Sequence, residues 1–215
     1  MQYGNPPEVV RSIKLDPSEM MLYLYLPIKM ADNFELRIPE RLKYLQEITN
    51  AVMYDAYASL GVKEIDENYY VYMTAKTLFV DAKSPGNRPG WHVDGYGSNG
   101  DLNYIWYDMN PTEFAIQDFH NIPDDDFESL EAMTAQVKDE TITTYPNETL
   151  IRLDESVVHR VNPKPETGVR TFIKVSVSKH RYDLKGNSHN HLFDYDWPMH
   201  DRSEVRNCDN SDFAK

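Results

Sequence analysis

The strongest helical pattern in the chain lies at residues 39–60. Apolar residues recur there at three- and four-residue steps, the spacing that gathers side chains on one face of an α-helix. Gly61 follows the last repeat, where a glycine commonly ends a helix. The sequence therefore predicts a helix with one buried face, and its repeating positions are Leu42, Leu45, Ile48, Val52 and Met53.

From residue 69 onward the pattern changes to short segments rich in β-branched and aromatic residues, separated by Pro, Gly, Asn and Asp. One further helix is predicted at 124–137, which opens with acidic residues suited to a helix N-terminus. Residues 9–28 predict one or two strands outside the main sheet. The main strands are predicted at 69–74, 77–80, 102–107, 141–145, 149–153, 157–161 and 169–178.

A helix followed by many short strands, without regular strand-helix alternation, favours a mainly β fold with supporting helices over a Rossmann or TIM-barrel fold. We expect an antiparallel barrel or jelly roll. Residues 1–68 supply N-terminal strands and the supporting helix, 69–180 the β core, and 181–215 a polar C-terminal extension, all within one domain. The extension is expected to cover the core and to roof a substrate pocket.

Charge and cysteine content narrow the classes of partner. The chain has 22 Lys and Arg against 35 Asp and Glu, a net charge of -13, which disfavours nucleic acid. Cys208 is the only cysteine, so an internal disulfide and a zinc site with two thiolates are excluded. The chain shows neither a signal-peptide pattern at its start nor the roughly 18 consecutive apolar residues of a membrane span. These features predict a cytoplasmic protein.

The candidate chemistry begins in the segment GWHVDG at residues 90–95. His92 and Asp94 are two residues apart, and an extended segment points two such side chains to the same side. His159, on a later predicted strand, is a third potential ligand. Two imidazoles and one carboxylate leave open positions on an octahedral metal, which suits Fe(II) that must bind both a cosubstrate and O₂.

Arg170 lies in the predicted strand that follows His159, beyond a turn at residues 162–168. Strand alternation places Arg170, Phe172, Lys174 and Ser176 on one face and mostly apolar residues on the other, which can pack on the helix at 39–60. Arg170 then points into the barrel. A buried guanidinium needs an anionic partner, since burying an unpaired charge is unfavourable.

The order and spacing of His92, Asp94, His159 and Arg170 resemble those of Fe(II)/2-oxoglutarate-dependent oxygenases, whose pattern is H-x-D/E, a distant His, and an Arg or Lys beyond it. The resemblance extends over residues 70–180 and is to prolyl-hydroxylase-like or phytanoyl-hydroxylase-like members. It implies a double-stranded β-helix, which is a cupin-like jelly roll. It also implies that the two histidines and Asp94 are catalytic iron ligands, while Arg170 binds the distal carboxylate of 2-oxoglutarate.

The resemblance further implies hydroxylation of a small molecule or an amino-acid side chain, with consumption of O₂ and release of succinate and CO₂. Asp94 favours oxygen transfer over halogenation, because related halogenases lack this carboxylate. Lys83 stands where many members have a cosubstrate Tyr, and Phe172 replaces a common hydroxyl residue. Lys83 and Tyr104 are predicted as further cosubstrate contacts, and a cation at residue 83 would favour a dianionic ligand. The residues predicted to line the substrate pocket are Trp91, Tyr96 and Trp106.

Two other functions fit part of this pattern. A cupin-like hydrolase or isomerase could use the same three ligands to bind zinc or manganese, and a non-catalytic jelly-roll binding protein could bury His92 and His159 as hydrogen-bonded core residues. The hydrolase or isomerase has no need of Arg170. That residue therefore favours the oxygenase over it.

Overall fold

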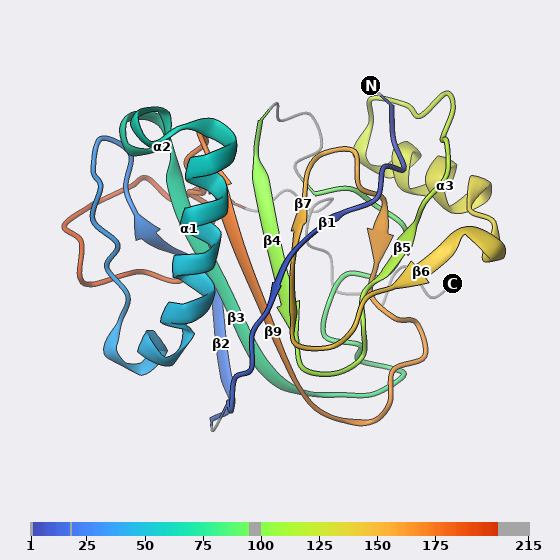
Figure 1. Ribbon diagram of the computed structural model, residues 1–215, viewed down its shortest axis with the longest axis horizontal. Coiled ribbons are helices and arrows are strands. Elements are labelled where there is room, and N and C mark those ends of the chain that lie inside the picture. Colours follow the sequence, from blue (N-terminus) through green and yellow to red (C-terminus); the bar gives the residue numbers. More distant parts are fainter. Residues whose placement is uncertain (1, 18, 95–99, 202–215) are drawn as a thin grey trace.

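The computed structural model describes residues 2–17, 19–94 and 100–201 and consists mainly of two antiparallel sheets (Figure 1). The larger sheet has six strands in the order β1-β7-β4-β9-β3-β2, and the smaller has three in the order β6-β5-β8. The strands of the larger sheet are β1 (Glu8–Ser12), β7 (Thr149–Leu153), β4 (Leu102–Tyr107), β9 (Gly168–Ser178), β3 (Tyr70–Val80) and β2 (Met21–Lys29). Those of the smaller sheet are β6 (Ile142–Thr144), β5 (Glu113–Ala115) and β8 (His159–Arg160).

The predicted helix at 39–60 is present, but its first turns form a 3-10 helix, η1 (Glu40–Leu45), before α1 (Gln46–Leu60). The short helix α2 (Val62–Asn68) follows and was not predicted. The second predicted helix is α3 (Asp126–Gln136), whose N-terminus is capped by the Asp125 carboxylate, and a 3-10 turn η2 (Asp139–Thr141) comes after it. None of the helices in the described part of the chain is long and apolar enough to cross a membrane.

Helix α1 lies across one face of the six-stranded sheet and buries it (Figure 1). On β9, Ile173, Val175 and Val177 belong to this apolar interface, as the alternation pattern predicts. Arg170 and Lys174 therefore lie on the opposite face, which looks toward the smaller sheet and which we call the inner face. The apolar residues of that inner face form a second cluster, made of Ile105, Tyr107, Phe114, Ile151, Leu153, Val157 and Phe172.

The N-terminal strands correct one expectation. They were predicted to lie outside the main sheet, yet β1 pairs with β7 and β2 pairs with β3, so that they form its two edges. The predicted strands 69–74 and 77–80 are one continuous strand, β3, because Ala75 and Lys76 keep the pairing with β9. Strand β5 was not predicted, and β8 is shorter than the predicted 157–161.

Candidate metal site and the cations around it

A backbone pairing brings the two candidate histidine ligands together. The His92 amide donates to the His159 carbonyl at 3.0 Å, and the His159 amide donates to the His92 carbonyl at 2.9 Å. The segment that carries His92 and Asp94 is thereby held against β8. One ligand atom from each of His92, Asp94 and His159 lies within 4.8 Å of the others, close enough to hold one metal ion.

Both imidazoles are oriented by main-chain carbonyls. Nδ1 of His92 lies 2.9 Å from the Gly90 carbonyl, and Nδ1 of His159 lies 3.0 Å from the Val157 carbonyl. A carbonyl oxygen only accepts, so each Nδ1 donates its proton there and leaves Nε2 as the ring nitrogen available to a metal, the orientation that ligating histidines commonly have. Burial and the neighbouring His159 lower the pKa of His92 to about 3, which keeps its imidazole neutral.

The Asp94 carboxylate is shared between the metal site and a buried lysine. Its Oδ2 lies 3.5 Å from Nε2 of His159, whereas its Oδ1 lies 2.8 Å from Nζ of Lys174 on β9. Burial alone raises the pKa of Asp94, but Lys174 and the two histidines hold it well below its usual value. Lys174 therefore fixes an ionised carboxylate with one oxygen facing the histidines. The sequence placed Lys174 on the face of Arg170 but did not reveal this ion pair.

Arg170 lies on the inner face as predicted and is only 3% exposed. Its Nε donates to the Met109 carbonyl at 2.9 Å, while its Nη2 is buried without a hydrogen-bond partner among the described residues. The guanidinium packs over the ring of Phe172 at 5.1 Å. Burial lowers its pKa to about 10, so it remains a cation near neutral pH. A buried guanidinium with an unused donor is suited to a carboxylate ligand.

Two further cations near the triad were missed. Lys76 on β3 donates to the Gly86 carbonyl at 3.2 Å and to Oδ1 of Asn87 at 3.1 Å, and burial together with Arg170 lowers its pKa to about 8. Arg88 follows in the same loop, and its Nη2 is also buried without a partner in the described chain. For Lys76, the available sequence signal was a lysine inside an otherwise apolar strand.

Three predicted ligand contacts are contradicted by their placement. Tyr104 and Trp106 lie on the face of β4 that packs on α1, where the Tyr104 hydroxyl donates to Asp55 and the Trp106 indole donates to the Ile13 carbonyl. The sheet separates both side chains from the triad. Lys83 is exposed on the loop after β3, and Lys76 and Lys174 supply the lysines near the triad instead.

Trp91 was predicted to line the substrate pocket beside the triad, but it lies in the core. Trp91 is 2% exposed, and its ring packs in a separate apolar cluster, with the Arg160 guanidinium 4.3 Å above it. Because neighbouring residues of an extended segment point to opposite sides, Trp91 turns away as His92 turns toward the metal site. It is therefore a core residue. Tyr96 lies outside the described residues.

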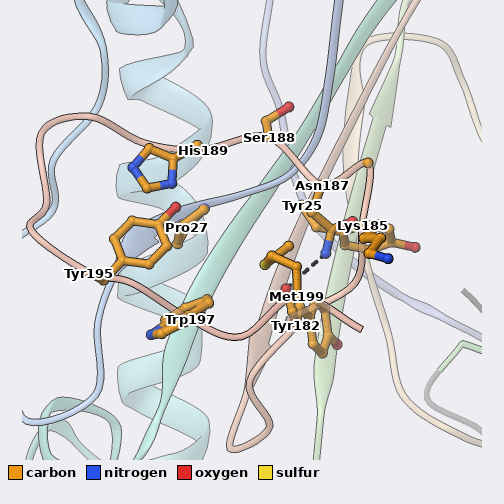
Figure 2. A pocket seen from close by; sticks show the side chains of 11 residues that line it. Tyr25, Pro27, Tyr182, Lys185, Asn187, Ser188, His189, Tyr195, Trp197 and Met199 are labelled. Carbon is orange, nitrogen blue, oxygen red and sulfur yellow. Dashed lines mark hydrogen bonds between the residues drawn. The ribbon is translucent and has the colours of Figure 1, made fainter. Parts of the chain in front are cut away.

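The C-terminal extension forms one wall of a pocket of about 260 Å³, with β2 as the other (Figure 2). Tyr182 stacks on Tyr72 with ring centroids 4.2 Å apart, and Tyr72 lies on the inner face because it pairs with Ser176. The Tyr25 amide bonds Thr74, and Thr74 pairs with Lys174, so this pocket lies beside the strand position that carries Lys174. Its aromatic lining consists of Tyr25, Tyr182, His189, Tyr195 and Trp197.

Tyr25 lies in this wall with a positive φ of 48° and within a register shift of β2 between Tyr23 and Leu26. A positive φ is uncommon for a bulky residue, and such strain is often found near functional sites. The Tyr25 amide donates to the hydroxyl of Thr74 at 3.0 Å, which ties the irregular turn to β3.

No protein-family model matches this sequence, and no curated protein matches it. Among solved structures, the chain is similar to a crystal structure of EvdO2 from Micromonospora carbonacea var. aurantiaca, with 18% identity and a TM-score of 0.40. A structure of the same protein complexed with 2-oxoglutarate gives 19% identity and a TM-score of 0.38. Each alignment covers 66% of this chain and 66% of the EvdO2 chain. Both TM-scores are low, so the likeness establishes neither a family nor a function.

Proposed function

We propose that this protein is an Fe(II)- and 2-oxoglutarate-dependent oxygenase that hydroxylates a small molecule or an amino-acid side chain. The observation that carries the proposal is the combination of three candidate ligands within 4.8 Å of one another and a buried arginine with an unused donor on the inner face. The ligand set fits the metal, since two neutral imidazoles and one carboxylate are the donors of the facial triad of non-haem Fe(II) oxygenases.

Each side chain has a defined part in this proposal. His92, His159 and Oδ2 of Asp94 hold the metal, while Lys174 keeps the other carboxylate oxygen occupied. Arg170 binds the distal carboxylate of 2-oxoglutarate through its free Nη2. When bound, Fe(II) and 2-oxoglutarate would supply an oxidation that consumes O₂ and releases succinate and CO₂. The apolar cluster between the sheets excludes water from that reaction.

Within this proposal the two sheets form a double-stranded β-helix. The antiparallel pairing of all strands supports this assignment. So does the His92–His159 bridge, which extends the smaller sheet toward the metal site. In such a fold the metal lies between the sheets.

The pocket between β2 and the C-terminal extension is proposed to receive the apolar part of the substrate. Ala substitutions at Tyr195 and Trp197, which line it, are expected to leave Fe(II) and 2-oxoglutarate binding unchanged and to reduce turnover of any substrate found by screening. Unchanged turnover in the double variant would show that the extension does not form the substrate site.

The test of the oxygenase is anaerobic addition of Fe(II) and 2-oxoglutarate. We expect a visible charge-transfer absorption, which is lost in His92→Ala and retained in His120→Ala. His120 is an exposed histidine outside the triad and serves as the matched control. The wild type should form succinate when O₂ is admitted. A zinc- or manganese-dependent hydrolase, or a binding protein, would give neither the band nor succinate.

A further inference from the structure

Arg88 is a second guanidinium near the triad with no counter-ion among the residues that the structure describes. The structure records no ion pair and no hydrogen bond for it within residues 2–17, 19–94 and 100–201, and its Nη2 is buried. The five residues that follow Asp94 in the sequence, GYGSN, contain no acidic side chain. An unsatisfied buried donor on a charged group is unfavourable, so its retention points to a ligand.

The loop that carries Arg88 is fixed on both sides of this residue. Before it, Lys76 holds the Gly86 carbonyl and the Asn87 side chain over the inner face. After it, the backbone pairing of His92 with His159 fixes the chain at the metal site. The loop is therefore fixed on both sides of Arg88 by contacts of other residues, and the charge of Arg88 contributes to the lowered pKa of His92.

The charges around the triad are unbalanced. Four cations influence one another or the triad there, namely Lys76, Arg88, Arg170 and Lys174, against the carboxylates of Asp94 and Asp108. Lys174 neutralises Asp94 directly, and Oδ1 of Asp108 accepts a hydrogen bond from the Thr171 amide. A divalent metal and a dianionic cosubstrate cancel each other, so their binding leaves this excess positive charge in place. In a chain of net charge -13, such a local excess requires an explanation.

We propose that the substrate oxidised at this site carries a carboxylate or phosphate group and that Arg88 binds it. This inference rests on the proposed oxygenase function and adds the chemical class of its substrate. A guanidinium matches either anion in a two-pronged hydrogen-bonded geometry. The negative surface of the protein opposes long polyanions, which favours a small acidic molecule over nucleic acid. In this proposal Arg170 binds the cosubstrate and Arg88 binds the substrate.

The test uses metal-free full-length protein and two probes, inorganic phosphate and benzoate. All proteins carry Arg170→Gln, which removes the proposed cosubstrate contact. Three are compared by thermal unfolding during titration with each probe: this parent variant, the parent with Arg88→Gln, and the parent with Arg41→Gln. Arg41 is an exposed arginine, with 74% of its side chain accessible, and controls for the loss of one surface charge. A ligand that binds only the folded state raises the melting temperature according to its affinity.

We expect the parent and the Arg41→Gln protein to bind at least one probe saturably. The Arg88→Gln protein should bind the same probe at least about tenfold more weakly, because a charged hydrogen bond is lost. Binding of phosphate alone indicates a phosphorylated substrate, and binding of benzoate alone indicates a carboxylic acid. Equal affinity with and without Arg88, or no saturable binding in the parent, would overturn the proposal. Arg88→Lys, which keeps the charge, should retain part of the affinity and guards against an effect of misfolding.

A separate titration distinguishes this inference from the proposed function. With Arg170 intact, Mn(II)-loaded Arg88→Gln should bind 2-oxoglutarate as the wild type does. If Arg88→Gln weakens 2-oxoglutarate binding as strongly as Arg170→Gln does, Arg88 belongs to the cosubstrate site and the substrate assignment is wrong. If the wild type does not bind 2-oxoglutarate at all, the oxygenase proposal fails, whereas the anion titration still reports on Arg88.

Discussion

Substitution of Lys174 by Met should destabilise the metal-free protein strongly. The Lys174–Asp94 pair is 2.8 Å long, and the two side chains are 13% and 19% exposed. Removing one partner of a buried pair leaves an uncompensated charge and costs about 3–5 kcal/mol. For a chain of 215 residues this corresponds to a fall in melting temperature of roughly 6–20 °C. Urea unfolding of both proteins without metal gives the free-energy difference directly.

The double variant with Asp94→Asn separates the ion pair from the loss of lysine packing. Because it removes both charges, it should be more stable than Lys174→Met alone, and the cycle of single and double variants then gives the coupling energy. Saturating Mn(II) should narrow the gap between Lys174→Met and the wild type, since the metal supplies a positive charge beside the same carboxylate. Lys179→Met is the control, because its pair with Glu64 is solvent-exposed and should contribute little to stability.

A loss below about 1 kcal/mol in Lys174→Met would refute this reasoning, because it would give the pair the energy of an exposed one. So would a double variant that is less stable than both single variants. Either result would mean that Asp94 is not held ionised by Lys174 in the metal-free protein.

Four further outcomes are expected. Arg170→Gln should weaken 2-oxoglutarate binding by about 2–5 kcal/mol, measured by calorimetry on Mn(II)-loaded protein, because it removes one partner of a buried charged contact. Tyr104→Phe should leave that affinity unchanged and cost about 1 kcal/mol in urea unfolding, because its hydroxyl donates to Asp55 on α1, on the face of the sheet turned away from the triad. The pKa of His92 is 6.5 in the unfolded chain and about 3 in the folded chain, so the unfolded chain binds the proton first as the pH falls. The free energy of unfolding of the metal-free protein should therefore decrease between pH 6.5 and pH 3, by up to about 1.4 kcal/mol per pH unit. The decrease should be smaller in His92→Gln. The pKa of Lys76 is about 8, so this side chain loses its positive charge as the pH rises through 8. The affinity for 2-oxoglutarate should therefore decline over this range in the wild type but not in Lys76→Met.

The candidate metal site could be predicted from the sequence because its geometry is mostly local. His92 and Asp94 are fixed relative to each other by the two-residue period of an extended segment. The position of His159 is not local, since it depends on the bridge between two distant segments. His159 could nevertheless be predicted as a ligand, because it follows Asp94 in the sequence and precedes Arg170 at the spacing of the oxygenase pattern. The sequence therefore identified the three residues that the structure brings within 4.8 Å of one another, and it placed Arg170 on the inner face.

The face assignment on β4 failed for a physical reason. Nearly every residue of this strand is buried, because one face packs on α1 and the other on the cluster between the sheets. A strand buried on both sides has no polar alternation to mark the inner face. Tyr104 was consequently predicted to contact the cosubstrate and Trp106 to line the substrate pocket, whereas Ile105 and Tyr107 occupy the inner face.

Contacts between distant segments account for the rest. Strand β1 pairs with β7, so that Glu8 lies opposite Arg152, and nothing near Glu8 in the sequence indicates that partner. The Lys174–Asp94 pair and the buried Nη2 of Arg88, which has no partner within the described ranges, likewise arise only when the loop after β3 folds over the inner face. These contacts between distant segments place the charged side chains around the three candidate ligands.

The proposed ligand set can be tested by a crystal structure of the protein with Mn(II) and 2-oxoglutarate, in which the metal is located by its anomalous scattering. We expect one metal bound by Nε2 of His92, Oδ2 of Asp94 and Nε2 of His159, with the distal carboxylate of 2-oxoglutarate on Nη2 of Arg170. A metal bound elsewhere, or 2-oxoglutarate whose distal carboxylate does not contact Arg170, would contradict it.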